Sequence, residues 1–332
     1  MGKRPPGPVG RFCPETHSLD GSALSRVVDA VGILDHIGQQ GAGMFRSVTF
    51  KNFRGFQDLT LGGLSRVNLI AGKNNAGKTA ALEGVFLLIA PNLPELTLRI
   101  HALRGIEQIA ALETWEWLFY DRKVDTPVRL EAETVQGTKC SLALRLTHAK
   151  KTKTVRKRKK GQPARIPEPG SLSTAAVKQL IVEYTDPSGG RHISHGIVSE
   201  RGLEWERASM PLYPIGFLLT PRGRNHSEDI ERFSRLAEVG REQEIVKALQ
   251  ALDKRIKDLK MLVTSGNLPM FYAEVGLSHL VPLSLMGDGV DRLLSMMCAV
   301  LLAKGGTVLI DEMENGLHHS VMKDVWKAVG LA

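Results

Sequence analysis

The chain has 332 residues, of which 42% are hydrophobic and 24% are charged, and this balance predicts an ordinary globular core. Its formal net charge of +9 is concentrated in one place, because the run from Lys150 to Lys160 holds eight Lys or Arg and no acid, which leaves +1 for the rest of the chain. The basicity is therefore a local feature, and an aromatic content of 5% argues against a stacking platform for single-stranded nucleic acid.

Cysteine usage and hydropathy exclude further classes. Cys13, Cys140 and Cys298 are widely spaced and form no CxxC pair, so the sequence predicts neither a disulfide framework nor a zinc site. The first residues lack the apolar run of a signal peptide, and the most apolar stretch, 293–310, is interrupted at Lys304 and the two glycines that follow. We therefore expect a cytoplasmic protein that makes no membrane contact.

The N-terminal part of the chain changes character near Met44. Residues 1–43 are rich in Gly and Pro at first and show no sustained period, which predicts a disordered or extended tail. Residues 45–50 alternate between apolar and polar side chains, and this alternation predicts a strand.

A glycine-rich loop follows between two apolar segments. Residues 67–71 are predicted to form a short strand that runs into the loop 72–79. Residues 79–89 are predicted to form an apolar helix, which Pro91 and Pro94 end.

The middle of the chain predicts a helix and three strands. The helix is expected over 108–120, and the strands 128–134 and 140–147 are expected to form a hairpin around Gly137. The basic run and a Pro-rich stretch then predict a loop, and a further strand is expected over 178–184.

Residues 227–262 are predicted to be helical, with Ser227 as the N-cap and Gly240 between two helices. In the second helix, apolar residues recur at steps of four and three: Ile245, Leu249, Leu252, Ile256 and Leu259. The stripe favours an amphipathic helix packed on its own domain, and the alternative is a protruding helical arm.

The last segment combines a turn, a helix and a strand. A strand is expected to begin near Phe271, a glycine-rich turn follows at 287–289, and a helix is predicted from 290 to 303. The strand 307–310 then ends in two acids.

The loop has the residues that a triphosphate requires. Glycines let the backbone curl so that successive N–H groups point inward, and the following helix adds the positive end of its dipole. Lys78 can reach the outer phosphates and the Thr79 hydroxyl suits Mg²⁺. The residues expected to bind ATP are Gly72, Lys73, Asn74, Asn75, Ala76, Gly77, Lys78 and Thr79.

The apolar run 307–310 is typical of a buried parallel strand that delivers carboxylates to the edge of a sheet. Asp311 is expected to hold Mg²⁺ through its water shell. Glu312 is expected to orient or deprotonate the attacking water, and together with Lys78 it forms the predicted catalytic set.

These segments together resemble the AAA-type ATPases of the OLD-like (overcoming lysogenization defect) group, within the wider class of ABC, SMC and RecF-like P-loop head domains. Phe50–Phe56 resembles the nFRgf turn of that group, 72–79 its Walker A form GxNnaGKT, Pro282–Arg292 its signature motif, and Leu309–His318 its Walker B motif and D-loop. The resemblance covers roughly residues 44–332, and its two ends are the most specific.

The resemblance implies a site shared by two chains. Each ATP would lie between the Walker A loop of one chain and the signature turn of an identical partner, in an ATP-dependent homodimer. The residues implied at the partner's ATP are Ser284, Gly287, Asp288 and Gly289, and those at the dimer seam are Asn315 and His318.

The resemblance also implies parts that this sequence lacks. The class has a histidine on a strand after Walker B, whereas this chain stops at Ala332, so we expect the C-terminal end of the domain to be missing and the activity to be impaired. No room remains for the Toprim nuclease of many OLD proteins, so no nuclease activity is predicted, and no glutamine is assigned to the Q-loop.

The expected fold class is α/β, a P-loop NTPase of ABC-ATPase type with a mixed central sheet, an antiparallel β subdomain and a helical insertion. The expected parts are a tail (1–43), the Walker A part (44–147), a basic and Pro-rich loop (148–172), a β segment (173–220), a helical insertion (221–270) and the signature and Walker B part (271–332).

Three functions remain open. The first is an ATP-hydrolysing head that drives a DNA-related or defence-related effector, such as a nuclease or another subunit. The second is a non-catalytic ATP-binding switch or scaffold, and the third is a small-molecule kinase, which the signature turn and the acid pair disfavour.

The basic run could bind DNA phosphates or form a solvated loop. Its cations are Lys150, Lys151, Lys153, Arg156, Lys157, Arg158, Lys159 and Lys160.

Overall fold

The computed structural model describes residues 45–106, 111–149, 177–199, 202–211, 213–214, 216–222, 225–263 and 268–331. The tail 1–43 and the basic run from Lys150 to Lys160 lie outside these residues.

Seven antiparallel strands form the largest sheet, in the order β2-β1-β3-β4-β5-β6-β7. The strands are β1 (Phe45–Phe53), β2 (Phe56–Gly62), β3 (Val128–Thr134), β4 (Lys139–Ala149), β5 (Val177–Thr185), β6 (Arg191–Ser199) and β7 (Gly202–Glu206). The alternation in the sequence predicted β1, the β3–β4 hairpin and β5, and all three predictions are confirmed. On β1, Val48 and Phe50 face the core, as a period of two requires.

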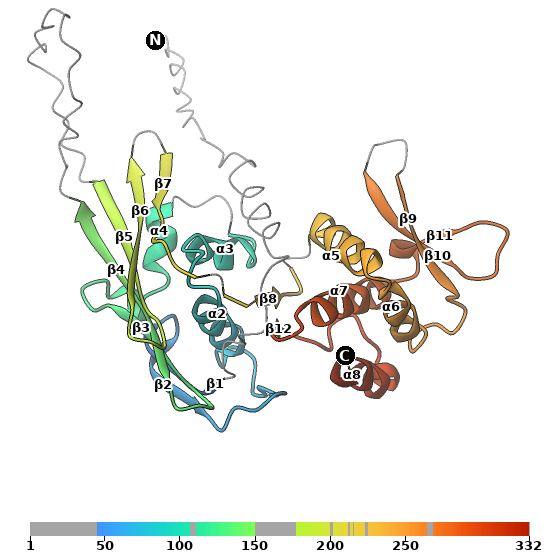
Figure 1. Cartoon of the computed structure of the whole chain (residues 1–332), viewed down its shortest axis with the longest axis horizontal. Helices are drawn as coiled ribbons and strands as arrows, with labels where there is room; N and C mark the ends of the chain where they lie inside the picture. The colour runs from blue at the N-terminus through green and yellow to red at the C-terminus, as the bar shows by residue number, and fades with distance from the viewer. Residues whose placement is uncertain are drawn as a thin grey trace, which may run out of the picture. The chain divides into compact units, whose positions relative to one another are not determined.

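Helix α2 (Lys78–Ile89) packs against this sheet (Figure 1). Gly84 makes the approach possible, because a Cβ placed there would lie 2.5 Å from the Phe50 ring. The short helix α3 (Leu96–Ala102) packs beside it, α4 (Ala111–Glu116) packs on α3, and the 3-10 turn η2 (Tyr120–Arg122) follows. The helix predicted over 108–120 is therefore shorter than expected, because among the described residues it spans only Ala111–Glu116.

A second, parallel sheet joins two strands that are far apart in the sequence. Strand β8 (Gly216–Leu219) pairs with β12 (Thr307–Ile310), and α2 contacts both. The Asp311 N–H continues the ladder by donating to the Leu219 carbonyl at 2.8 Å. The strand predicted at the acid pair is therefore confirmed, together with a partner that the sequence did not indicate.

The strand predicted at 67–71 is wrong in this structure. Those residues form no strand, and Val67 and Leu69 are 61% and 75% exposed. The side chains of Ser65 and Asn68 instead bond the local backbone, with Asn68 Oδ1 accepting from Ser65 N–H at 2.9 Å. A strand needs a neighbour for its N–H and C=O groups, and an apolar sequence pattern alone does not provide one.

Helix α7 (Asp288–Leu302) organises the second core. It contacts α5 (His226–Glu238), α6 (Glu242–Leu249) and α8 (Met322–Leu331), as Figure 1 shows. A three-stranded antiparallel sheet with the order β11-β10-β9 belongs to the same core. The remaining elements of the described residues are β9 (Asp258–Val263), β10 (Pro269–Glu274), β11 (Val281–Pro282), η3 (Leu283–Leu285) and η4 (His319–Val321).

The helix predicted to reach residue 262 ends at Leu249. The side chain of Asp253 accepts from the Arg255 N–H at 2.9 Å, which favours a turn, and Leu259 then lies on β9. Ile245, Leu249, Ile256 and Leu259 of the apolar stripe are buried and Leu252 is half-buried. Only Ile245 and Leu249 lie on a helix, so the stripe indicated burial better than it indicated helix. No described helix forms the alternative protruding arm across this stripe.

The N-cap of α5 is Asn225 and not Ser227, because the Asn225 side chain accepts from the Ser227 N–H at 3.1 Å. Among the described residues, no helix is both long and apolar enough to cross a membrane.

Candidate nucleotide site

The loop before α2 has the backbone of an anion-binding turn. Asn75 and Gly77 have positive φ angles of 62° and 90°, and the helix begins directly after them at Lys78 without a side-chain cap. The first N–H groups of α2 are therefore available to an anion at the positive end of the helix dipole. The Phe56 ring packs against the loop at Gly77, because a Cβ added to Gly77 would lie 2.7 Å from that ring.

Lys78 folds back over this loop. Its ammonium donates to the carbonyls of Gly72 at 2.8 Å and Lys73 at 3.0 Å. The positive charge is therefore held at the exposed mouth of the loop, where phosphate oxygens can replace the two carbonyls.

Thr79 and Asp311 meet although 232 residues separate them. The Thr79 hydroxyl donates to Asp311 Oδ2 at 2.7 Å, and Asp311 is only 6% exposed. A hydroxyl and a carboxylate on adjacent segments are oxygen donors of the kind that Mg²⁺ prefers when substrate phosphates complete its shell. The residues present therefore fit the cation expected from the sequence.

Arg292 on α7 fixes the backbone that carries the two acids. Its guanidinium donates to the carbonyls of Asp311 and Glu312, both at 2.6 Å, and the residue is buried. Glu312 has a positive φ of 47°, a backbone conformation that residues other than glycine rarely adopt. Its carboxylate is exposed and accepts from the Asn315 amide at 3.3 Å. The surrounding bonds hold Glu312 in this conformation.

The glycine turn packs against the turn that follows Glu312. A Cβ added to Gly289 would lie 2.6 Å from the Gly316 carbonyl oxygen, so only glycine permits this approach. Several of the residues expected at a partner's ATP or at the dimer seam are exposed. They are Ser284, Gly287, Asp288, Asn315 and His318. His318 is also bonded locally, because its Nδ1 lies 2.8 Å from Ser320 Oγ.

A buried carboxylate in α2 was given no role by the sequence. Glu83 is 1% exposed and pairs with Arg54 at 3.0 Å and with Arg104 at 2.6 Å. Burial lowers the pKa of Arg54 to about 10, and burial together with the Arg54 charge lowers that of His101 to about 3. The available sequence signal was an acid one turn after Thr79 in an otherwise apolar helix.

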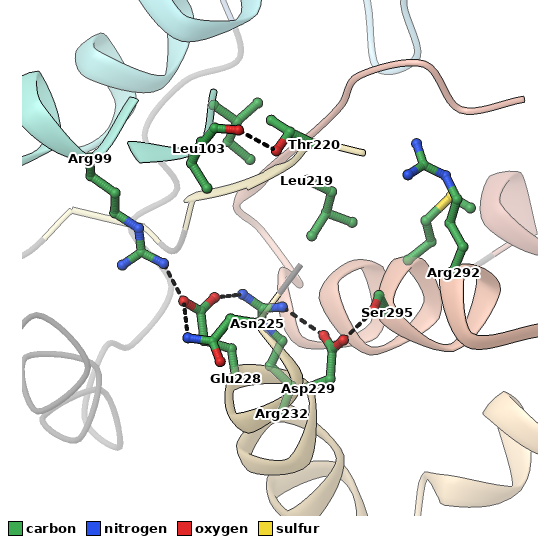
Figure 2. Close-up of a pocket in the computed structure, with 12 residues that line it drawn as sticks. Arg99, Leu103, Leu219, Thr220, Asn225, Glu228, Asp229, Arg232, Arg292 and Ser295 are labelled. Carbon is green, nitrogen blue, oxygen red and sulfur yellow. Dashed lines mark hydrogen bonds and ion pairs between the residues drawn. The ribbon is translucent and has the colours of Figure 1, made fainter. Parts of the chain in front are cut away.

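A polar network lies beside Arg292 (Figure 2). Glu228 pairs with Arg99 and with Arg232, and Asp229 bonds Arg232 at 2.9 Å and the Ser295 hydroxyl. The cavity among these residues measures about 30 Å³, which suits water and is far too small for a nucleotide. The network therefore ties α3, α5 and α7 together and is not the nucleotide pocket.

Comparison with known proteins also points to an ATPase. A family model described as an AAA domain, putative AbiEii toxin, Type IV TA system, matches residues 194–328, a range that includes the glycine turn and both acids. An ATP/GTP phosphatase of Helicobacter pylori is 22% identical over 293 residues, which are 84% of this chain and 78% of that protein. An uncharacterized protein of Methanocaldococcus jannaschii, MJECL10, is 45% identical over 47 residues, which are 14% of this chain and 22% of its own length. These matches support a P-loop ATPase with a mixed α/β fold.

Proposed function

We propose that this chain is an OLD-like, ABC-type ATPase that binds ATP with Mg²⁺ and hydrolyses it in a site shared with a second copy of itself. The observation that carries the proposal is the bond between Thr79 and Asp311, since it joins the phosphate loop to the acidic strand. The support from relatives is the AAA-domain match and the similarity to an ATP/GTP phosphatase.

Each group at the loop has a stated task in this proposal. The N–H groups at the start of α2 bind the phosphates, and Lys78 exchanges its two carbonyl partners for phosphate oxygens. Thr79 and Asp311 hold Mg²⁺, which supplies charge neutralisation at the transferred phosphate. Glu312 orients the attacking water and accepts its proton.

A second copy of the chain completes the site. The exposed turn at Ser284–Gly289 presents the N-terminus of α7, and this end of a helix favours the terminal phosphate of an ATP held by the partner. Asn315 and His318 then lie at the seam between the two chains. In this arrangement, ATP favours the dimer, and a single chain is a poor catalyst.

We expect ATP turnover per chain to rise with protein concentration, because each complete site needs two chains. Phosphate release measured over a dilution series, beside ATP binding, tests this expectation. Lys78→Met impairs one half of the site and Asp288→Arg the other, so mixing these two inactive variants restores part of the activity. Turnover that is independent of concentration and no rescue on mixing contradict the shared site. Tight ATP binding with no turnover at any concentration identifies the non-catalytic switch instead.

We further propose that the ATPase drives a DNA-related or defence-related effector, and that the basic run from Lys150 to Lys160 contacts DNA. The run contains eight cations and no acid. When such cations bind the phosphate backbone they release its counterions, so the affinity for DNA falls steeply as salt rises. Deletion of the run is expected to weaken binding to a duplex by at least about tenfold in a gel-shift assay at low salt. An unchanged shift across the salt series removes the run from the DNA-binding account.

A further inference from the structure

Glu83 pairs with two arginines, and the proposed mechanism does not explain the second one. Arg54 already provides this carboxylate with a countercharge at 3.0 Å. Arg104 adds a bidentate pair, with Nε at 2.6 Å from Oε1 and Nη2 at 3.0 Å from Oε2. One buried carboxylate is therefore bound by two arginines, and a positive charge is left over in a largely buried cluster.

The fold brings this extra charge close to the predicted metal position. Glu83 follows Thr79 by four residues in α2, so the two side chains lie on the same face of the helix, one turn apart. Thr79 in turn bonds Asp311. The hydrogen bonds of Glu83 raise the pKa of Arg104, and the charges of Glu83 and Asp311 raise it further. The backbone beside Arg104 also lies close to Asp311, because the Leu103 carbonyl accepts from the Thr220 hydroxyl at 3.5 Å and the adjacent Leu219 carbonyl accepts from the Asp311 N–H at 2.8 Å.

The exposure of the two arginines separates their roles. The Arg54 side chain is 10% exposed, whereas that of Arg104 is 36% exposed. Arg54 is enclosed with Glu83, and Arg104 remains partly accessible to solvent. A bidentate pair also holds the guanidinium in one orientation, so its charge is fixed in place before any ligand arrives.

We propose that Arg104 is a fixed cation of the nucleotide site, which balances Asp311 in the empty protein and attracts the terminal phosphates of ATP. This inference rests on the proposed function, because it assigns the residue to the same site. It concerns ground-state electrostatics, and Arg104 takes no part in proton transfer. Glu83 is the positioning residue that holds it.

An electrostatic role has a signature that a structural role lacks. Removing a positive charge strengthens the binding of a cation at Asp311 and weakens the binding of an anion at the loop. Loss of local structure weakens both. The two ligands must therefore be measured separately, the metal without nucleotide and the nucleotide without metal.

The test uses Arg104→Gln, because Glu83 then keeps Arg54 as its partner. Binding of Mn²⁺ to the full chain is followed by electron paramagnetic resonance without nucleotide, and binding of ATP is measured by calorimetry in EDTA. We expect Mn²⁺ to bind about threefold to tenfold more tightly and ATP to bind more weakly by a similar factor. Arg104→Lys keeps the charge and is expected to bind both ligands like the wild type.

Arg207→Gln is the matched control, since it removes an arginine that pairs with Glu95 at the opposite end of α3. It is expected to change neither affinity. Equal weakening of both ligands in Arg104→Gln, or no change in either, overturns the inference while wild-type ATP binding still upholds the nucleotide site. If Arg104→Gln does not fold, an Arg104→Lys chain whose two affinities shift in the same direction overturns it as well. A wild-type chain that binds no ATP contradicts the proposed function itself.

Discussion

Replacing Glu312 with glutamine is expected to lower ATP turnover by about a hundredfold to ten-thousandfold while ATP remains bound. Glutamine has nearly the same shape and can still accept from the Asn315 amide, but it cannot take a proton from water. Phosphate release under single-turnover conditions measures the chemical step, and nucleotide binding is measured on the same sample. The loss is expected in the rate and not in the affinity, since the role proposed for Glu312 is to act on water rather than on the phosphates.

Glu314→Gln is the matched control for this variant. Glu314 is an exposed carboxylate two residues further on, and only its backbone carbonyl has a described bond, which it accepts from the Leu317 N–H at 3.0 Å. Its replacement is expected to leave turnover unchanged. A Glu312→Gln chain that retains the wild-type rate removes Glu312 from the proposed mechanism, and another base must then be found.

Replacing Glu83 with glutamine is expected to destabilise the fold by about 3–5 kcal/mol, because it leaves Arg54 and Arg104 charged and without the carboxylate that pairs both of them. Arg54 has the larger share of this cost, since burial already lowers its pKa to about 10. Urea unfolding followed by circular dichroism measures the free energy of unfolding.

The control here is Glu131→Gln, which breaks an ion pair with Lys51 on the open face of the sheet. Both side chains of that pair are 45% exposed and their charged atoms lie 3.8 Å apart, so the expected loss is at most about 1 kcal/mol. Equal losses in Glu83→Gln and Glu131→Gln contradict the assignment of Glu83 as the anchor of a buried charge cluster.

The sequence predicted the elements whose pattern is local. Helix α2 follows from the apolar run after the glycine loop, and β12 follows from the apolar run before Asp311. The meeting of Thr79 with Asp311 could also be anticipated, because both residues were expected to hold the same cation. For the helix and the strand, one short segment contains the whole signal, whereas the Thr79–Asp311 pair was anticipated from a shared role.

Features that depend on a distant partner could not be predicted in this way. Leu259 continues the same apolar stripe as Leu249, yet it lies on β9 because β10 pairs with it there. Leu69 belongs to the short apolar run that predicted a strand, but residues 67–71 form none and Leu69 stays exposed. Nothing periodic connects Arg104 to Glu83 or Arg292 to the carbonyl of Asp311, since such contacts depend on the tertiary fold.

The lysine of the phosphate loop has one more consequence. Because Lys78 binds the carbonyls of Gly72 and Lys73, two backbone oxygens hold the position proposed for phosphate oxygens. In the proposed site, nucleotide entry is then an exchange of partners, and its net gain is the difference between two sets of hydrogen bonds. Product departure runs the same exchange backwards, and the two carbonyls recapture the ammonium as phosphate leaves. In the proposed ATPase, the same contacts that oppose tight binding therefore favour rapid release and repeated turnover.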